Sequence, residues 1–309
     1  GIDSISAGLL IAFGYYINMF WSPIANLSSF YNQLITNVAA AERIFEVLDT
    51  DSAISDKEDA TELSDITGQV TFKDVTFAYS DAPDIKVLEN VNFTIAPGET
   101  IALVGPTGAG KTTIVNLISR FYDATAGEVL IDGTDVRDVT LESLRSRMGI
   151  MTQDNFLFSG TIKDNIRYGK LDATDEEIIN AAKAVGAHDF IMKMEKGYDT
   201  VLSERGGGLS IGQKQLLAFA RTFVSMPRIL ILDEATSSID THTERMVQEG
   251  IAALLKGRTS FVIAHRLSTI QNADRIFVVS DNGILESGTP AELMEKKGAY
   301  YRLYMAQVV

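Results

Sequence analysis

The sequence predicts an α/β domain with a mainly parallel core sheet, preceded by one long apolar helix. Two observations support this prediction. Strand-like and helix-like runs alternate from about residue 69 to the C-terminus, and residues 4–41 contain no charged side chain. Alternating strands and helices are typical of parallel sheets, because a helix returns the chain between parallel strands. An uncharged stretch of this length exceeds the roughly 20 residues that cross a bilayer.

Composition excludes several classes of protein. The chain has 309 residues, of which 27 are Lys or Arg and 41 are Asp or Glu, so the net charge is −14. Such an acidic chain is a poor nucleic-acid binder, because DNA and RNA attract clustered positive charge. The chain has no cysteine, which excludes disulfides, Cys-based zinc sites, iron–sulfur clusters and a cysteine nucleophile.

The uncharged stretch at the start of the chain predicts a membrane-spanning helix, and the helical pattern continues to Leu48. Aromatic side chains at Tyr15, Tyr16, Trp21 and Tyr31 suit a membrane interface or a helix-packing face. The alternative is a buried helix of a soluble protein. A signal peptide is excluded, since the basic leading region is missing and the apolar part is too long. The chain starts with Gly rather than Met, and its opening reads as the middle of a longer protein.

Residues 49–68 are polar, acidic and aperiodic, and predict a linker. The domain over 69–309 opens with the alternating strand "VTFKDVTFAY" and a hairpin-like "VNFTIAPGETIALVG", which indicate a small antiparallel sheet. Helices are expected over 112–122, 174–194, 243–255 and 290–307, and strands over 127–133, 228–233, 259–265 and 275–288.

One motif predicts phosphate binding. Residues 105–112 match G-x-x-x-x-G-K-[ST] between an apolar strand and a helix. The glycines let backbone N–H groups surround phosphate oxygens, Lys111 supplies a cation, and the Thr112 hydroxyl can ligate Mg²⁺. The alternative is a chance match in a glycine-rich turn, which the strand–loop–helix context disfavours.

A second motif supplies carboxylates. The strand "ILILD" ends in Asp233, and Glu234 follows directly. Asp233 would face the metal and Glu234 would polarise the attacking water. On its own, this pair would be a solvated acidic strand end.

A third motif is a second anion-binding helix start. Ser210 and Gln213 fit the capping box S-x-x-[EQ], and Gly212 leaves the helix start open. Locally this is only a good helix start. Two phosphate-binding helix starts in one chain require two nucleotides, or one nucleotide held by two chains.

The P-loop, "LSIGQ", "ILILDEATSSID" and "VIAHR" together resemble the ATPase domain of ABC transporters, from about residue 69 to the C-terminus. The opening segment, residues 1–48, resembles the last transmembrane helix of an exporter-type half-transporter with its cytoplasmic extension, so we expect several further hydrophobic spans before it. The resemblance implies a P-loop NTPase fold of the ABC type, in which a mainly parallel core sheet is joined by an antiparallel β subdomain and a helical subdomain. The signature most often reads LSGGQ in this family, and here Ile211 replaces the first glycine.

The resemblance also implies the site residues, by motif. The nucleotide-binding residues are Tyr79, Gly105, Pro106, Thr107, Gly108, Ala109, Gly110, Lys111, Thr112 and Thr113. The Mg²⁺ ligands are Thr112, Gln153 and Asp233, and the catalytic residues are Glu234, His265 and Gln153. The signature acting on a partner's nucleotide is Leu209, Ser210, Ile211, Gly212 and Gln213. The D-loop residues are Ser238 and Asp240, and Glu204 and Arg205 contact the membrane part.

The function implied is ATP hydrolysis that drives export of an amphipathic, drug-like or lipid-like substrate across the cell membrane. ATP and Mg²⁺ are the expected cofactors. The expected partners are a second half-transporter chain, with a heterodimer favoured over a homodimer, the membrane and a small-molecule substrate, but no nucleic acid. The ATPase domain is expected on the cytoplasmic side. Two alternatives are a soluble ABC-type ATPase acting on nucleic acid or ribosomes, and a degenerate subunit that binds ATP only to regulate.

Overall fold

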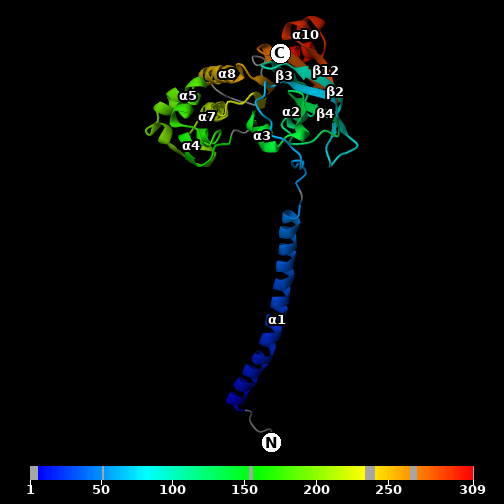
Figure 1. Cartoon of the computed structure of the whole chain (residues 1–309). Coiled ribbons are helices and arrows are strands. Elements are labelled where there is room, and N and C mark those ends of the chain that lie inside the picture. Colours follow the sequence, from blue (N-terminus) through cyan, green and yellow to red (C-terminus); the bar gives the residue numbers. More distant parts are fainter. Residues whose placement is uncertain (1–5, 51, 153–155, 234–240, 265–269, 309) are drawn as a thin grey trace. The chain divides into compact units, whose positions relative to one another are not determined.

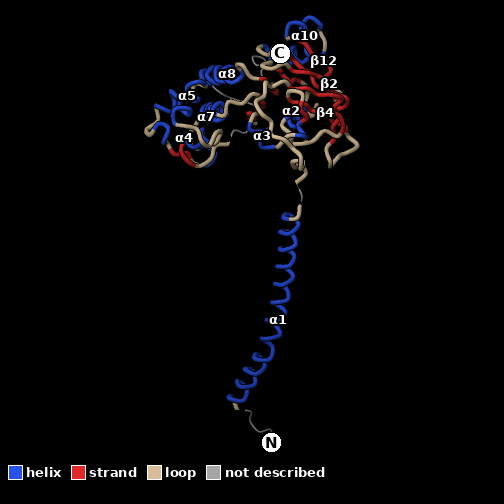
Figure 2. Tube along the Cα trace, in the orientation of Figure 1, coloured by secondary structure: helices blue, strands red, loops and turns tan. Residues whose placement is uncertain are grey.

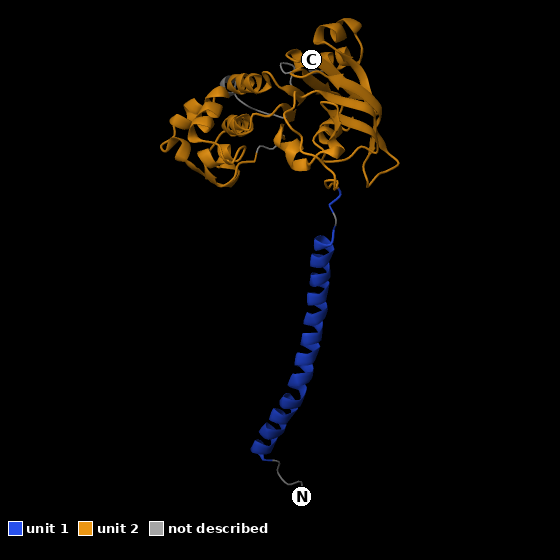
Figure 3. Ribbon diagram, in the orientation of Figure 1, with its two compact units in different colours: residues 1–53 blue, residues 54–309 orange. Residues whose placement is uncertain are grey.

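The computed structural model describes residues 6–50, 52–152, 156–233, 241–264 and 270–308. The chain divides into two compact units, residues 1–53 and residues 54–309 (Figure 3). Each unit is described by itself.

Unit 1 is one helix, α1 (Ala7–Leu48), which begins at the N-cap Ser6 and contains Pro23. At 1.5 Å per residue, its 42 residues extend about 63 Å, roughly twice the hydrocarbon thickness of a bilayer. It is the one helix among the described residues that is long and apolar enough to cross a membrane. Its apolar side chains are exposed along its whole length.

The centre of unit 2 is a six-stranded sheet in the order β12-β11-β3-β10-β9-β6. Its strands are β3 (Thr100–Val104), β6 (Met148–Met151), β9 (Ile229–Asp233), β10 (Thr259–Ile263), β11 (Arg275–Ser280) and β12 (Gly283–Gly288). Strands β3 and β12 of this sheet are labelled in Figure 1. All neighbouring pairs are parallel except β11 and β12, which form an antiparallel hairpin at one edge. The mainly parallel core sheet is therefore as the sequence predicts.

A four-stranded antiparallel sheet, in the order β2-β1-β4-β5, lies beside the core sheet. Its strands are β1 (Val70–Ala78), β2 (Lys86–Ile95), β4 (Ala126–Ile131) and β5 (Thr134–Asp135). Phe93 stacks on Phe72 at 4.4 Å between ring centroids and meets Phe277 of β11 at 5.1 Å, so one aromatic side chain joins the two sheets. Helix α2 (Lys111–Ile118) contributes Ile114, Leu117 and Ile118 to the same core.

Helices α4, α5, α7 and α8 gather on one side of unit 2, away from the antiparallel strands (Figure 2). The helices here are α4 (Ile162–Arg167), α5 (Asp175–Ala184), α6 (His188–Met192), α7 (Ile211–Val224) and α8 (Thr241–Leu255). They share a second core with one face of β9. The single helix predicted over 174–194 is wrong: α5 ends before Gly186, whose φ of +75° favours a left-handed helix stop.

The remaining elements are short. They are α3 (Leu141–Ser146), β7 (Gly160–Thr161), β8 (Val201–Leu202), α10 (Pro290–Lys296), α11 (Ala299–Val308) and three 3₁₀ turns at Val136–Asp138, Gly197–Asp199 and Glu204–Gly206. Leu293 of α10 and Tyr300 of α11 are buried in a third core against β3 and β11.

Residues 54–68, which are part of the stretch 49–68 predicted as a linker, belong to unit 2 and pack against the rest of that unit. Leu63 and Ile66 are buried in the first core, and Thr61 forms a parallel bridge with Val139. The Asp132 carboxylate accepts hydrogen bonds from the backbone N–H groups of residues 67–69. The polar composition of residues 54–68 does not indicate this packing, because most of the hydrogen bonds that hold the segment use its backbone atoms.

The Asp132 contacts predict a pH-dependent contribution to stability. Burial raises the pKa of Asp132, but hydrogen bonds from Thr67, Gln69 and Gly68 outweigh it and hold the pKa below its ordinary 3.8. We expect Asp132→Asn to lower the free energy of unfolding by about 1–2 kcal/mol at neutral pH. The difference in free energy of unfolding between Asp132→Asn and the parent chain should be full above the ordinary pKa of 3.8. It should shrink as the pH falls through the lower pKa that Asp132 has in the folded state.

Urea unfolding followed by circular dichroism between pH 7 and pH 3 measures this difference. Asp84→Asn, at an exposed carboxylate between β1 and β2, is the control. If Asp132→Asn costs no more stability than Asp84→Asn, or if its cost grows at low pH, the Asp132 carboxylate does not stabilise the fold through these hydrogen bonds.

Candidate functional site

The carboxyl ends of the parallel strands meet at one edge of the core sheet. Strand β10 pairs with both β3 and β9, and the pairs Ile263–Leu103 and Ile263–Asp233 bring the three strand ends into line. Strand β6 ends beside β9, where Met151 pairs with Leu232. In open parallel sheets, ligands bind outside this edge.

The loop 105–110 leaves β3 at this edge and leads into α2. Gly105 has a φ of +149°, and a Cβ at this position would collide with the carbonyl oxygen of Val279. Gly110 is the N-cap of α2, with a φ of +101° and no side-chain cap. The first N–H groups of α2 therefore have no side-chain acceptor at the cap, and the helix dipole favours an anion there.

Lys111 lies over this loop. Its side chain is buried, with the residue only 8% exposed, and its Nζ donates to the carbonyl oxygens of Gly105 and Pro106, both at 2.8 Å. Burial lowers the pKa of Lys111, and the Asp233 carboxylate opposes this shift through its charge. The structure thus brings a desolvated cation and the strand-end carboxylate to one place.

Tyr79 lies next to the same helix. It directly follows β1, and its hydroxyl is 3.0 Å from Thr113 Oγ1. Its ring makes edge contacts with Phe77 at 4.9 Å and with Tyr122 at 5.1 Å between centroids. The aromatic side chain is therefore held beside the phosphate-binding turn, with part of its surface exposed.

Hydroxyl and carboxylate oxygens are the available ligands for a hard cation. Thr112 is exposed on the first turn of α2, and Asp233 is half-buried at the end of β9. Such oxygen donors suit Mg²⁺, which usually keeps several waters and takes only one or two protein ligands. The described residues contain no group of three or more His, Asp or Glu side chains that would hold a metal alone.

The helix start at Ser210 forms the capping box that its spacing predicts. Ser210 Oγ accepts from Gln213 N at 3.2 Å, and Gln213 Oε1 accepts from Ser210 N at 3.0 Å. Gly212 is buried and Leu209 is half-buried, whereas Ile211 is 58% exposed. The branched side chain that replaces glycine thus points into solvent and leaves the cap intact.

The Glu204–Arg205 pair lies on an exposed 3₁₀ turn before α7. Arg205 has a φ of +60°, and its backbone N–H donates to Leu157 O at 3.0 Å. Both side chains are accessible to a partner.

Five predicted site residues lie outside the described residues: Gln153, Glu234, Ser238, Asp240 and His265. Their described neighbours Thr152, Asp233 and Ala264 follow or end β6, β9 and β10. Those three strands all end at the edge that carries the phosphate-binding loop.

One residue at this edge was missed by the sequence analysis. Gln215 of α7 is only 6% exposed, and its Oε1 has no hydrogen-bond partner within the described part of the chain. It lines a cavity of about 20 Å³ together with Thr152 and Asp233. The only sequence signal was a polar residue on the apolar face of a helix.

The chain is similar to known proteins over nearly its whole length. A family model described as ABC transporter matches residues 88–237. The uncharacterized ABC transporter ATP-binding protein YknV of Bacillus subtilis is 49% identical, covering 99% of this chain and 50% of that protein. The ATP-dependent lipid A-core flippase of Syntrophus aciditrophicus is 47% identical, covering 98% of this chain and 50% of that protein.

A solved structure of an ABC exporter is also similar to this chain. The structure of a bacterial Atm1-family ABC exporter with ATP bound matches with a TM-score of 0.81 and 38% identity, covering 98% of this chain and 53% of that one. The chain spans about half the length of the curated relatives it matches.

The capping box predicts different costs for two neighbouring substitutions. Ser210→Ala removes the acceptor for Gln213 N and should lower the free energy of unfolding by about 1 kcal/mol. Ile211→Ala removes an exposed side chain and should change it by less than about 0.5 kcal/mol. Denaturant unfolding of the two variants checks this; equal losses would mean that the cap contributes nothing.

Proposed function

Because the chain belongs to the ABC transporter family, we propose that it is the ATP-hydrolysing, membrane-coupling part of an exporter that works as a dimer. The observation that carries this proposal is the position of Lys111, which is buried over the glycine loop after β3, at the sheet edge where β9 ends in Asp233. Residues 1–48 would form the last transmembrane helix with its cytoplasmic extension, and residues 69–309 the nucleotide-binding domain. The ATPase domain would lie on the cytoplasmic face of the cell membrane.

The residues around α2 suit ATP. The backbone N–H groups of 105–113 would bind the phosphates, Lys111 would exchange its two carbonyl acceptors for phosphate oxygens, and the Tyr79 ring would stack on adenine. Thr112 and Asp233, with Gln153, would hold Mg²⁺. When bound, Mg²⁺ neutralises phosphate charge in the transition state.

Hydrolysis would depend on residues at the same edge. Glu234 would polarise the attacking water, and His265 would contact the γ-phosphate. Gln153 would sense both the nucleotide and the membrane part. Because these three side chains lie outside the described residues, their roles rest on the motifs and on the strand ends that precede them.

The signature helix suits a nucleotide held by a second chain. Helix α7 lies among the helices on one side of unit 2, and α2 lies toward the antiparallel strands (Figure 1). Ser210 and Gly212 would cap the γ-phosphate bound to a partner's P-loop, with the Ser238–Asp240 loop at the interface. ATP would then close the dimer, and loss of the bridging phosphate would reopen it.

An amphipathic substrate fits the membrane segment best. The uncharged face of α1 carries aromatic side chains with Asn18 and Asn26, a composition suited to a lipid-like or drug-like molecule. One similar protein is described as a lipid A-core flippase. Glu204 and Arg205 would pass dimer closure to the membrane part. A heterodimer is favoured over a homodimer, because the signature run resembles that of bacterial multidrug exporters, which include the consensus subunit of heterodimeric ones.

Two substitutions separate nucleotide binding from hydrolysis. Glu234→Gln should keep ATP binding and lower steady-state hydrolysis by about 10²–10⁴-fold, because only the water loses its polarising carboxylate. Lys111→Ala should weaken ATP binding itself. Nucleotide affinity and phosphate release are measured on the same preparations. Near-normal turnover in Glu234→Gln, or unchanged affinity in Lys111→Ala, would reject the proposed site.

The proposed stacking of the Tyr79 ring on adenine predicts that substitution of Tyr79 changes KM for ATP rather than kcat. Tyr79→Ala should raise KM for ATP by about tenfold and spare kcat, because stacking on adenine is the same in the ground and transition states. Tyr79→Phe keeps the ring and loses only the Thr113 contact, so it should retain most of the affinity. If Phe and Ala have equal effects, the hydroxyl rather than the ring is what matters.

A complementation test probes the two-chain site. Ser210→Arg and Glu234→Gln should each abolish hydrolysis alone. In a mixed dimer, one composite site carries both changes and the other carries neither, so the mixture should regain activity. Mixed dimers as inactive as either parent would show that Ser210 does not act on the partner's nucleotide. If the natural partner is a different chain, that chain carries one of the two substitutions.

A further inference from the structure

We propose that Arg120 is a positioning residue that ties the phosphate-binding helix α2 to the junction segment, residues 54–57, which directly follows unit 1 in the chain. Through this contact, nucleotide binding at the start of α2 would act on the chain that leads to α1. The inference rests on the proposed function, since it requires ATP to bind at the start of α2.

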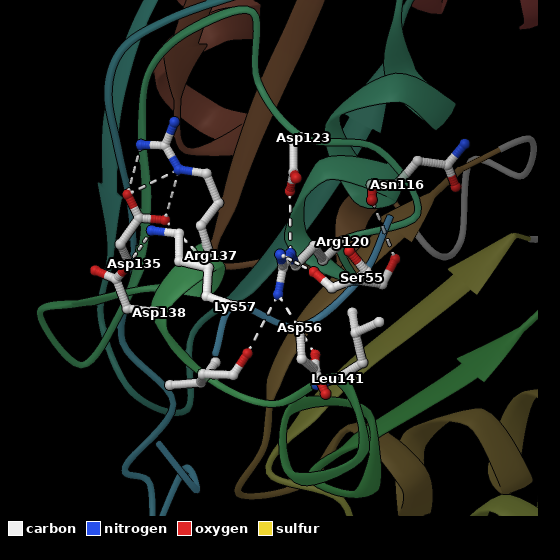
Figure 4. Close-up of polar contacts among 12 residues, drawn as sticks. Ser55, Asp56, Lys57, Asn116, Arg120, Asp123, Asp135, Arg137, Asp138 and Leu141 are labelled. Atoms are coloured by element: carbon white, nitrogen blue, oxygen red, sulfur yellow. Dashed lines mark hydrogen bonds and ion pairs between the residues drawn. The ribbon is translucent and has the colours of Figure 1, made fainter. Parts of the chain in front are cut away.

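Arg120 is held by a set of buried contacts. It lies two residues beyond α2 and is only 2% exposed. Its Nη2 donates to Ser55 O at 3.0 Å, its Nη1 to Val139 O at 3.2 Å, and its Nε to Asp123 Oδ1 at 3.0 Å (Figure 4). The Asp56 carboxylate lies 3.8 Å from Nη1. A buried guanidinium needs such partners, because an uncompensated buried charge is strongly destabilising.

The backbone of Arg120 is fixed as firmly as its side chain. Its φ of +51° is uncommon outside glycine and ends α2 sharply. Arg145 Nη2 donates to Arg120 O at 2.8 Å, and the Arg145 guanidinium lies over the Phe121 ring at 4.9 Å. The turn after α2 therefore has little freedom to move independently of the helix.

The junction segment is anchored from two sides. Asp56 Oδ1 accepts from Leu141 N at 2.8 Å, and Lys57 pairs with Asp138. The Lys57–Asp138 pair is about half exposed on both sides, so it contributes little to stability. Among the described contacts, the hydrogen bond to Ser55 O and the ion pair with Asp56 link this segment directly to the turn after α2, and both come from the buried Arg120 side chain.

The same turn also reaches the nucleotide pocket. Tyr122, two residues after Arg120, meets the edge of the Tyr79 ring, whose hydroxyl contacts Thr113. Helix α2 has eight residues and is about 12 Å long. A short rigid helix and its C-terminal turn thus connect the phosphate loop and the proposed adenine contact at one end with Ser55 at the other.

A purely structural role for Arg120 predicts only a loss of stability. A positioning role predicts a nucleotide-dependent signal in the junction segment that disappears while nucleotide still binds. Since the chain has no cysteine, Glu58→Cys supplies a single spin-labelling site at an exposed position next to the segment. The full chain is labelled in detergent micelles and titrated with Mg²⁺ and a non-hydrolysable ATP analogue.

In the parent background, the label should change mobility as the analogue binds. With Arg120→Lys, which keeps the charge but loses the planar fork, the analogue should still bind and most of the mobility change should be lost. Arg137→Lys is the matched control, because Arg137 pairs with Asp135 and Gly127 O, and its described hydrogen bonds and ion pairs do not reach the junction segment (Figure 4). It should keep the full change.

Three outcomes overturn the inference: a parent label that does not respond to bound analogue, an undiminished change in Arg120→Lys, or an equal loss in Arg137→Lys. If Arg120→Lys fails to fold, Asp123→Asn weakens the same cluster from a more exposed side chain and must reduce the change instead. Failure of the parent chain to bind the analogue would reject the proposed function rather than the role of Arg120.

Discussion

The packing of α2 between two sheets is the constraint on which the rest of unit 2 depends. Its apolar face, with Ile114, Leu117 and Ile118, lies in the core that the antiparallel and core sheets share. Because that core fixes the helix on its buried side, the loop before it and the turn after it have defined positions. The phosphate-binding loop and the Arg120 cluster are therefore two ends of one buried element.

Much of the architecture could be predicted from local rules. The glycine loop between β3 and α2, the capping box at Ser210 and the strand ending in Asp233 each follow from short-range geometry, and the structure has all three. The break at Gly186 was also readable, because a glycine within a helical pattern can end the helix. The prediction failed there because the apolar periodicity continues across the break.

Long-range contacts could not be predicted in this way. Nothing local to residues 54–68 indicates that Ser55 O would meet a guanidinium 65 positions later, or that Asp132 would hold the turn before β1. Both contacts use backbone donors or acceptors, which every residue has, so they leave no mark on composition. Gln215 is similar: its burial depends on how α7 packs against β9, which a single sequence does not specify.

The hydrogen bonds of Lys111 have a consequence for which anions the loop can distinguish. Any anion that takes the ammonium group must replace two carbonyl oxygens, each already at 2.8 Å. A single monatomic anion such as chloride can meet the ammonium group or the N–H groups of the helix start, but it cannot span both at once. A chain of phosphates offers several charged oxygens at once, so it gains from the lysine and the backbone N–H groups together. The folded loop therefore favours anions that have enough charge and length to bind Lys111 and the helix start together. It selects in this way against the small anions that are abundant in any cell.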